Sequence, residues 1–164
     1  MNTEYARTLI DYHIGSNNHL WECIMALTDA QFVQPCAYSL GSVRHQLVHM
    51  VNVDIRWLAR LQERELPPSL NPDDFTTRES VRARHDEIAA QFRAYVDGLD
   101  DAALARTVTY DMPHRGGLKT TPIWQIVAHV ANHGTDHRGQ VLRLLHDLGA
   151  PTFEQDLMIY LWGK

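Results

Sequence analysis

The chain has 164 residues, enough for one domain with a single sizeable core, and its 45% hydrophobic and 21% charged residues are typical of a globular protein. The formal net charge of −5 and the lack of a basic run argue against a nucleic-acid partner. No apolar run approaches the length of a membrane span and the first residues lack a signal-peptide pattern, so we expect a cytoplasmic protein with no membrane partner.

Ten histidines are the unusual feature of the composition. The two cysteines, Cys23 and Cys36, are too few for a disulfide framework. Cys23 falls inside an expected helix, where a small buried hydrophobe is a better interpretation than a nucleophile. The histidines are therefore the candidates for chemistry.

The first helix is predicted from about Thr3 to Leu27, because its apolar residues recur with helical spacing. His13 and Asn17 lie on the same apolar stripe. They are either a hydrogen-bonded pair in the core or part of a pocket near other histidines. A short turn follows at 28–32, with Asp29 as its expected cap.

The second helix is predicted from about Val43 to Glu63, with Ser42 as N-cap. His45 and His49 form an i, i+4 pair on it. His49 lies about 200° around the helix axis from Leu47, away from the centre of the apolar stripe. Periodicity alone therefore favours solvated or partner-facing histidines here.

The segment Leu66–Asp74 contains three prolines and cannot be helical, so it is predicted to be a connecting loop rather than a domain boundary. Thr77 is the expected cap of a third helix, about Arg78 to Leu99. A short capped turn at 100–104 follows it.

A small two-stranded hairpin is predicted next, because Arg106–Asp111 alternates β-rich residues and a glycine pair separates it from Leu118–Thr120. Thr121 is the expected N-cap of a fourth helix, with Pro122 at its first position. After that helix, the tail from Thr152 to Lys164 is expected to add a further helical turn.

The fourth helix, about Pro122 to Leu148, carries the pair His133 and His137. Residues four apart lie one turn above each other, and two such imidazoles can bind one metal ion at about 2.0–2.1 Å. His137 falls within the apolar stripe and His133 at its edge. The alternative is two core histidines bonded to carbonyl or carboxylate oxygens.

Four amphipathic segments predict an all-α protein, a four-helix bundle with a small β-hairpin before the last long helix, in one domain over residues 1–164. Two of the links are long, so parallel neighbours are possible as well as the simple up-down order. Cofactor and metal sites in such bundles are built from facing helices.

Two segments carry a resemblance to a known family. The second helix reads His49–Leu58 (HMVNVDIRWL) and the fourth reads His133–Gln140 (HGTDHRGQ), closed by Leu148-Gly149. Together they resemble the DinB/YfiT-like superfamily. The resemblance implies a four-helix bundle, commonly a homodimer, with a divalent metal ion, usually zinc or nickel. It implies His49, His133 and His137 as the metal ligands.

Only the resemblance directs His49 to the metal. A local distortion of the helix, or a site at the open edge of the bundle, would reconcile it with the periodicity. His45, one turn earlier, is the alternative ligand. His129, one turn before His133, is expected to be structural or to support a ligand.

The other residues of the HGTDHRGQ segment receive no catalytic role. Asp136 is either a surface carboxylate or a hydrogen-bond partner of a histidine N–H. Arg138 and Gln140 are assigned to helix packing and surface pairing. Gly134 and Gly139 each cost about 1 kcal/mol inside a helix, which indicates a close approach of another element.

Three neutral imidazoles leave room at the metal for water or substrate, as in catalytic rather than structural zinc sites. We therefore expect a metal-dependent enzyme acting on a small molecule. Transfer of a low-molecular-weight thiol to an electrophile comes first and hydrolysis second, as the resemblance implies. The alternatives are a non-catalytic, metal-binding stress-response dimer and a purely structural bundle. The sequence identifies no general base.

Overall fold

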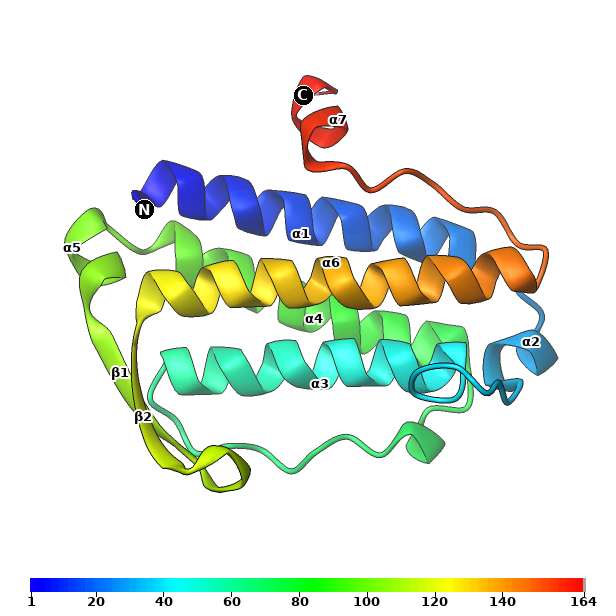
Figure 1. The fold of residues 1–164 in the computed structure, drawn as a ribbon, viewed down its shortest axis with the longest axis horizontal. Helices are drawn as coiled ribbons and strands as arrows, with labels where there is room; N and C mark the ends of the chain where they lie inside the picture. The colour runs from blue at the N-terminus through cyan, green and yellow to red at the C-terminus, as the bar shows by residue number, and fades with distance from the viewer. Residues whose placement is uncertain (164) are drawn as a thin grey trace.

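Four long helices form the frame of the fold (Figure 1), and the computed structural model describes residues 1–163. Helix α6 packs against α1 and α3, and α4 packs against the same two helices. Figure 1 shows that α1 and α6 run in one direction and α3 and α4 in the other, so each of these pairs is parallel. The predicted bundle is confirmed, and its long helices are α1 (Thr3–Ile24), α3 (Val43–Leu61), α4 (Arg78–Asp97) and α6 (Ile123–Asp147).

Shorter elements join the long helices. Strand β1 (Thr107–Met112) pairs antiparallel with β2 (Gly117–Pro122), which confirms the predicted hairpin. The tail forms a helical turn as expected, although Lys164 lies outside the described residues. The short helices are α2 (Asp29–Val33), η1 (Pro72–Asp74), α5 (Asp101–Ala105), η2 (Pro113–Arg115) and α7 (Leu157–Trp162).

Side-chain caps start most of the helices. Ser42 and Thr77 accept backbone N–H groups in the first turns of α3 and α4, as predicted. The prediction of Asp29 as a cap is wrong, because Thr28 caps α2 and forms a reciprocal pair with Gln31. Helix α3 also ends two residues earlier than predicted, and Glu63 beyond it has a φ of 53° that no continuing helix adopts.

The start of α6 differs from the prediction. Thr121 and Pro122 belong to β2, and Pro122 rather than Thr121 occupies the N-cap position, without a side-chain hydrogen bond to the helix. The pairing of the hairpin continues as far as Pro122, so Thr121 stays extended and its hydroxyl bonds to that of Tyr110 at 2.8 Å. The N–H of Ile123 donates to the carbonyl oxygen of Arg106 at 2.9 Å. The hairpin is thus continuous with the helix that carries His133 and His137.

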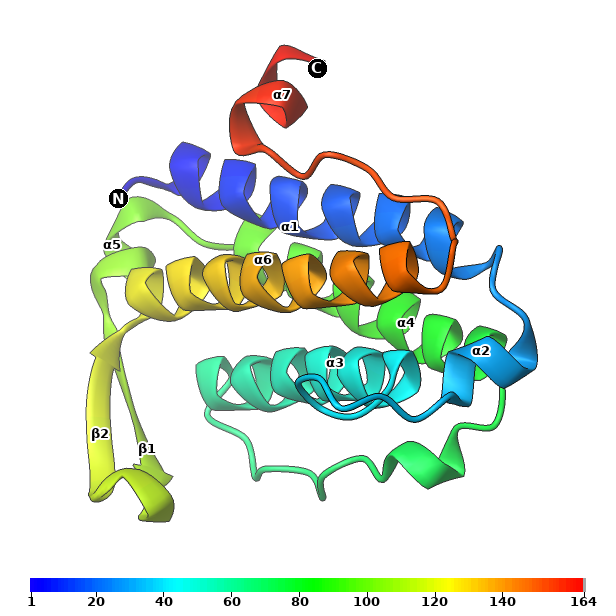
Figure 2. The same cartoon turned by 45° about the vertical axis from the view of Figure 1, so that its right-hand side comes forward.

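The link between α3 and α4 runs back beside α3 (Figure 2), which is why these two helices can be parallel. Arg44 on α3 pairs with Asp73 of η1 at 2.5 Å. The side-chain oxygen of Asn52 accepts the N–H of Leu70 at 3.0 Å. The link is therefore fastened to the helix at two points. None of the helices within residues 1–163 has the length and apolarity to cross a membrane.

Candidate metal centre

Three histidine rings converge where α3 faces α6. The Nε2 atoms of His49 and His133 lie 3.3 Å apart. The ring centre of His137 lies 4.6 Å from that of His49 and 4.3 Å from that of His133. One ring nitrogen from each residue falls within 4.8 Å of the others. The structure thus brings together the three histidines that the resemblance implied as ligands.

The spacing of these nitrogens matches that of ligands on one ion. Two nitrogens bound at about 2.0–2.1 Å in a tetrahedron lie about 3.3–3.4 Å apart. The Nε2 atoms of His49 and His133 are separated by 3.3 Å. The packing of α3 against α6 therefore places them at the spacing that a tetrahedral metal ion requires.

Periodicity alone favoured a solvated or partner-facing His49, and this interpretation is wrong. Helix α3 packs against α4 and α6 together, so its buried sector is wider than its apolar stripe. Gln46 is fully buried and extends that sector to within about 60° of His49. His49, His133 and His137 are all partly exposed, so the site lies at the edge of the bundle, and no helix distortion is needed.

A chain of hydrogen bonds fixes the tautomer of His137. The carboxylate of Asp136 accepts from the NH₂ group of Gln140 at 3.1 Å, so the Gln140 oxygen is free to accept from the NH₂ group of Gln46 at 2.9 Å. The Gln46 oxygen then faces Nδ1 of His137 at 2.8 Å. An amide oxygen only accepts, so Nδ1 carries the proton and Nε2 holds a lone pair.

This series of hydrogen bonds gives Asp136 and Gln140 a role that the sequence did not reveal. Neither touches the ring, but together they orient the amide that does. Gln46 is 91 residues from His137 in sequence, and no local motif links the two. A buried glutamine next to an expected ligand on the same helix is the only hint that the sequence offered.

Burial keeps the three rings neutral. It lowers the pKa of His133 to about 4, with smaller contributions from the neighbouring His137 and His49. Burial also lowers the pKa of His49 and of His137. At neutral pH each ring is therefore uncharged and keeps a lone pair on one of its two nitrogens, which is the state that binds a metal ion.

His129 and His45 lie outside the cluster. The exposed ring of His129 packs edge-on against Trp57, with ring centres 5.0 Å apart, and the guanidinium of Arg60 covers Trp57 at 4.8 Å. His45 is instead bound through Nδ1 to the hydroxyl of Ser42 at 2.6 Å. The geometry favours His49 over His45 as the partner of the α6 histidines.

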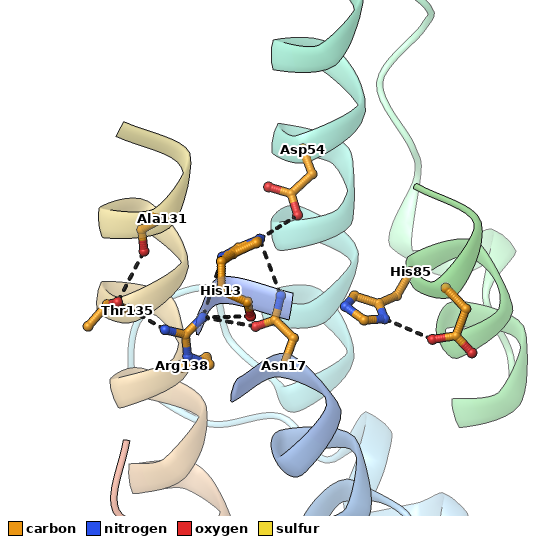
Figure 3. A network of polar contacts seen from close by, with 8 residues as sticks. His13, Asn17, Asp54, His85, Ala131, Thr135 and Arg138 are labelled. Atoms are coloured by element: carbon orange, nitrogen blue, oxygen red, sulfur yellow. Dashed lines mark hydrogen bonds and ion pairs between the residues drawn. The ribbon is translucent and has the colours of Figure 1, made fainter. Parts of the chain in front are cut away.

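A buried polar network joins residues of α1, α3 and α6 (Figure 3). Nε2 of His13 lies 3.1 Å from a carboxylate oxygen of Asp54, and Arg138 donates to the side-chain oxygen of Asn17 at 3.1 Å. His13 and Asn17 therefore form a hydrogen-bonded core group, the first of their two interpretations. The assignment of Arg138 to surface pairing is wrong, because its side chain is 0% exposed.

The guanidinium of Arg138 joins three parts of the chain. It donates to the hydroxyl of Thr135 and to the side-chain oxygen of Gln155, both at 2.9 Å, and it lies 5.1 Å from the ring centre of Tyr12. The network thus ties α1 and the tail to the turn of α6 that separates His133 from His137.

Asp54 is the member of this network that sequence reasoning missed. It lies about 20° from Leu47 around the axis of α3, near the centre of the apolar stripe. A carboxylate in that position is buried and must be paired, and this signal was present in the sequence.

Gly134 permits the close contact between α1 and α6. A Cβ atom at this position would lie 2.3 Å from Nδ1 of His13, which is too close for any residue other than glycine. The close approach predicted from this glycine is confirmed. At Gly139 a Cβ would lie 3.4 Å from Nε2 of Gln155, which is an ordinary van der Waals distance, so the constraint there is mild.

Comparison with known proteins agrees with the geometry. A family model described as the DinB family matches residues 1–164. The chain belongs to the DinB family. It is 23% identical over 165 residues to Protein DinB of Bacillus subtilis (strain 168), which covers 98% of this chain and 95% of that protein. The fold resembles the crystal structure of a DinB family member from Shewanella denitrificans, with a TM-score of 0.64, 18% identity and coverage of 96% and 95%.

Proposed function

We propose that this DinB family protein binds one divalent metal ion through His49, His133 and His137, and uses it to catalyse a reaction of a small molecule. The observation that carries the proposal is the 3.3 Å separation of the His49 and His133 Nε2 atoms, with His137 beside both. The fixed tautomer of His137 supports it further, because it leaves Nε2 of this ring with a lone pair that can bind a metal ion.

Zinc or nickel is the proposed ion. Imidazole nitrogens suit both metals, whereas calcium and magnesium prefer oxygen ligands. The three rings provide three ligands, and a fourth position remains for water or substrate, as in catalytic zinc sites.

We infer thiol transfer to an electrophile as the reaction, with hydrolysis as the second candidate. A bound divalent ion supplies Lewis acidity, which lowers the pKa of a coordinated thiol or water. The chain's own residues hold three neutral rings in place and keep one side of the centre open to solvent. The small thiol and the homodimer are both proposals that follow from the family resemblance.

Metal analysis tests the centre. We expect about one zinc or nickel ion per chain in purified protein, and a large loss of metal in His49→Ala, His133→Ala and His137→Ala. His129→Ala is the matched control, since it removes a histidine from the same helix whose ring lies 5.8 Å from that of His133 but which is not one of the three clustered ligands. Full metal content in His49→Ala would exclude α3 from the centre.

Activity is tested with the metal-loaded protein. A panel of electrophiles is offered with each of several small cellular thiols, and product formation is followed by mass spectrometry. We expect turnover that depends on one thiol and disappears in His133→Ala. Metal binding with neither thiol transfer nor hydrolysis in any combination would favour a metal-binding protein without catalytic activity.

A further inference from the structure

A small cavity lies beside the candidate metal centre, between α3 and the link that follows it. Figure 2 shows this link running beside α3. Its volume is about 210 Å³, and His49 forms part of its wall. Sites for drug-sized ligands measure about 300–1,000 Å³, so this cavity suits a compact molecule. Its apolar walls come from the loop before α3, from α3 itself and from the link: Leu40, Val48, Leu70 and Pro72.

His45 contributes a hydrogen-bond donor to this cavity. The buried hydroxyl of Ser42 already accepts the backbone N–H of His45 at 3.1 Å, so its own proton needs an acceptor. Nδ1 of His45 lies 2.6 Å away and serves as that acceptor. The ring proton therefore sits on Nε2, and Nε2 has no hydrogen-bond partner within residues 1–163.

Asn52 contributes a second donor. Its side-chain oxygen accepts the N–H of Leu70 at 3.0 Å, which identifies the oxygen and leaves the NH₂ group available. Within the described part of the chain no other hydrogen bond involves this amide. The two polar side chains next to His49 thus each offer an N–H group without a partner within residues 1–163, whereas the Asn52 oxygen is already engaged by Leu70.

We propose that this cavity is the substrate subsite of the metal centre, and that it takes a compact aliphatic molecule bearing a carboxylate or carbonyl oxygen. The oxygen accepts hydrogen bonds from His45 Nε2 and from the Asn52 amide, and the aliphatic body lies against Leu70 and Val48. Only an acceptor complements a lining of donors, because a donor there would leave N–H groups facing N–H groups. The proposal rests on the proposed function for its catalytic meaning, but the subsite itself needs no metal.

The cavity wall is held in place before any ligand arrives. The pair between Arg44 and Asp73 and the bond from Leu70 to Asn52 fasten the link to α3 on one side of the cavity. A wall that is already ordered adds little entropic cost on binding. We therefore expect a fragment-sized ligand to bind strongly enough to be measured.

Isobutyrate is the probe, and isobutylamine, which has a similar body and donates hydrogen bonds, is the matched control ligand. Each is titrated to about 50 mM into metal-free and zinc-loaded protein while ¹H–¹⁵N spectra are recorded. We expect isobutyrate to shift the signals of His45, Asn52 and Leu70 in both forms, and isobutylamine to leave them unchanged.

Two variants test the donors separately. His45→Phe keeps a flat ring but removes both nitrogens, and Asn52→Asp keeps the acceptor for Leu70 but replaces the donor by a carboxylate oxygen. Each is expected to weaken isobutyrate binding about tenfold or more, because each loses a hydrogen bond to a charged group. His114→Phe, an exposed position on η2, is the control and should bind like the parent.

The outcomes separate this inference from the proposed function, since zinc content is measured in the same samples. Equal binding of isobutylamine, no binding of isobutyrate, or full isobutyrate affinity in both variants would overturn the subsite even if zinc is bound. Donor-dependent isobutyrate binding by a protein that takes up no metal would uphold the subsite and overturn the metal-dependent function.

Discussion

At the scale of single residues, the candidate centre depends on side chains that never reach the metal position. Gln46 is the clearest case, because it is fully buried and holds Nδ1 of His137 with its amide oxygen. Its own orientation is set by Gln140 and, beyond it, by Asp136. Ligand geometry is therefore shared between α3 and α6.

Gln46→Leu tests this dependence. Leucine is of similar size but cannot accept the hydrogen bond from Nδ1–H of His137, so the ring is free to rotate or change tautomer. We expect metal affinity to fall about 10–100-fold with little loss of helical content. Competition with a chelator measures the affinity, and Gln125→Leu, on the exposed face of α6, is the control that should bind metal normally.

The lowered histidine pKa values predict how stability depends on pH. In the unfolded chain His133 has a pKa of about 6.5, and in the folded protein burial lowers it to about 4. Between these values the unfolded state binds more protons, so the metal-free protein should lose stability as pH falls from about 6.5 toward 4. One proton gives a slope of about 1.4 kcal/mol per pH unit, reduced by the partial exposure of the ring.

Urea unfolding of metal-free protein at a series of pH values measures this slope. His133→Asn removes the group and should make the dependence shallower, although His49 and His137 also have lowered pKa values and contribute. A slope that is the same in the parent and in His133→Asn would show that the proton uptake belongs to other groups.

At the scale of elements, the contact between α1 and α6 is set by one missing side chain. Gly134 faces His13 so closely that an added Cβ would overlap its ring. The ring is held by Asp54 and lies beside Arg138, and it has no room to move away. Two buried polar groups thus depend on the glycine that lies between His133 and His137.

Gly134→Ala and Gly139→Ala form a matched pair within one helix. At Gly134 the clash outweighs the gain in helix propensity, and we expect a loss of about 2 kcal/mol or more in the free energy of unfolding. At Gly139 an added Cβ would make only an ordinary contact of 3.4 Å with Gln155, so alanine should be neutral or stabilising by up to about 1 kcal/mol. Urea unfolding of both variants decides; equal effects would mean that the His13 contact is not the reason for Gly134.

The elements also show what the sequence could and could not predict. Caps and breakers are local, so the long helices, the proline-rich link and the hairpin were predictable. The N-cap of α6 was not, because the partner strand of the hairpin keeps Thr121 extended. Periodicity failed for His49, because the buried sector of α3 depends on where α4 and α6 pack. Contacts such as Gln46 with His137 arise only from tertiary packing.

At the scale of the whole molecule, the candidate centre connects two antiparallel helices that no hairpin turn joins. An ion held by His49 from α3 and by the two α6 histidines would crosslink these helices in the folded state alone. Such linkage stabilises the fold by about 2.7 kcal/mol at a free metal concentration 100 times the Kd.

Thermal unfolding with and without zinc measures this linkage. For a chain of this size we expect the melting temperature to rise by about 5–10 °C at that excess. The triple variant His49→Ala, His133→Ala, His137→Ala should show no rise. A comparable rise in the triple variant would mean that zinc binds elsewhere.

The separation of His49 and His133 by 84 positions has a consequence for how the protein matures in the cell. At a synthesis rate of about 5–20 residues per second, the ribosome adds the second histidine about 4–17 s after the first. During that interval the growing polypeptide displays only one of the three ligands. An ion that needs ligands from both helices would therefore bind only after His133 has been synthesised, and it could not guide the folding of the helices that precede α6.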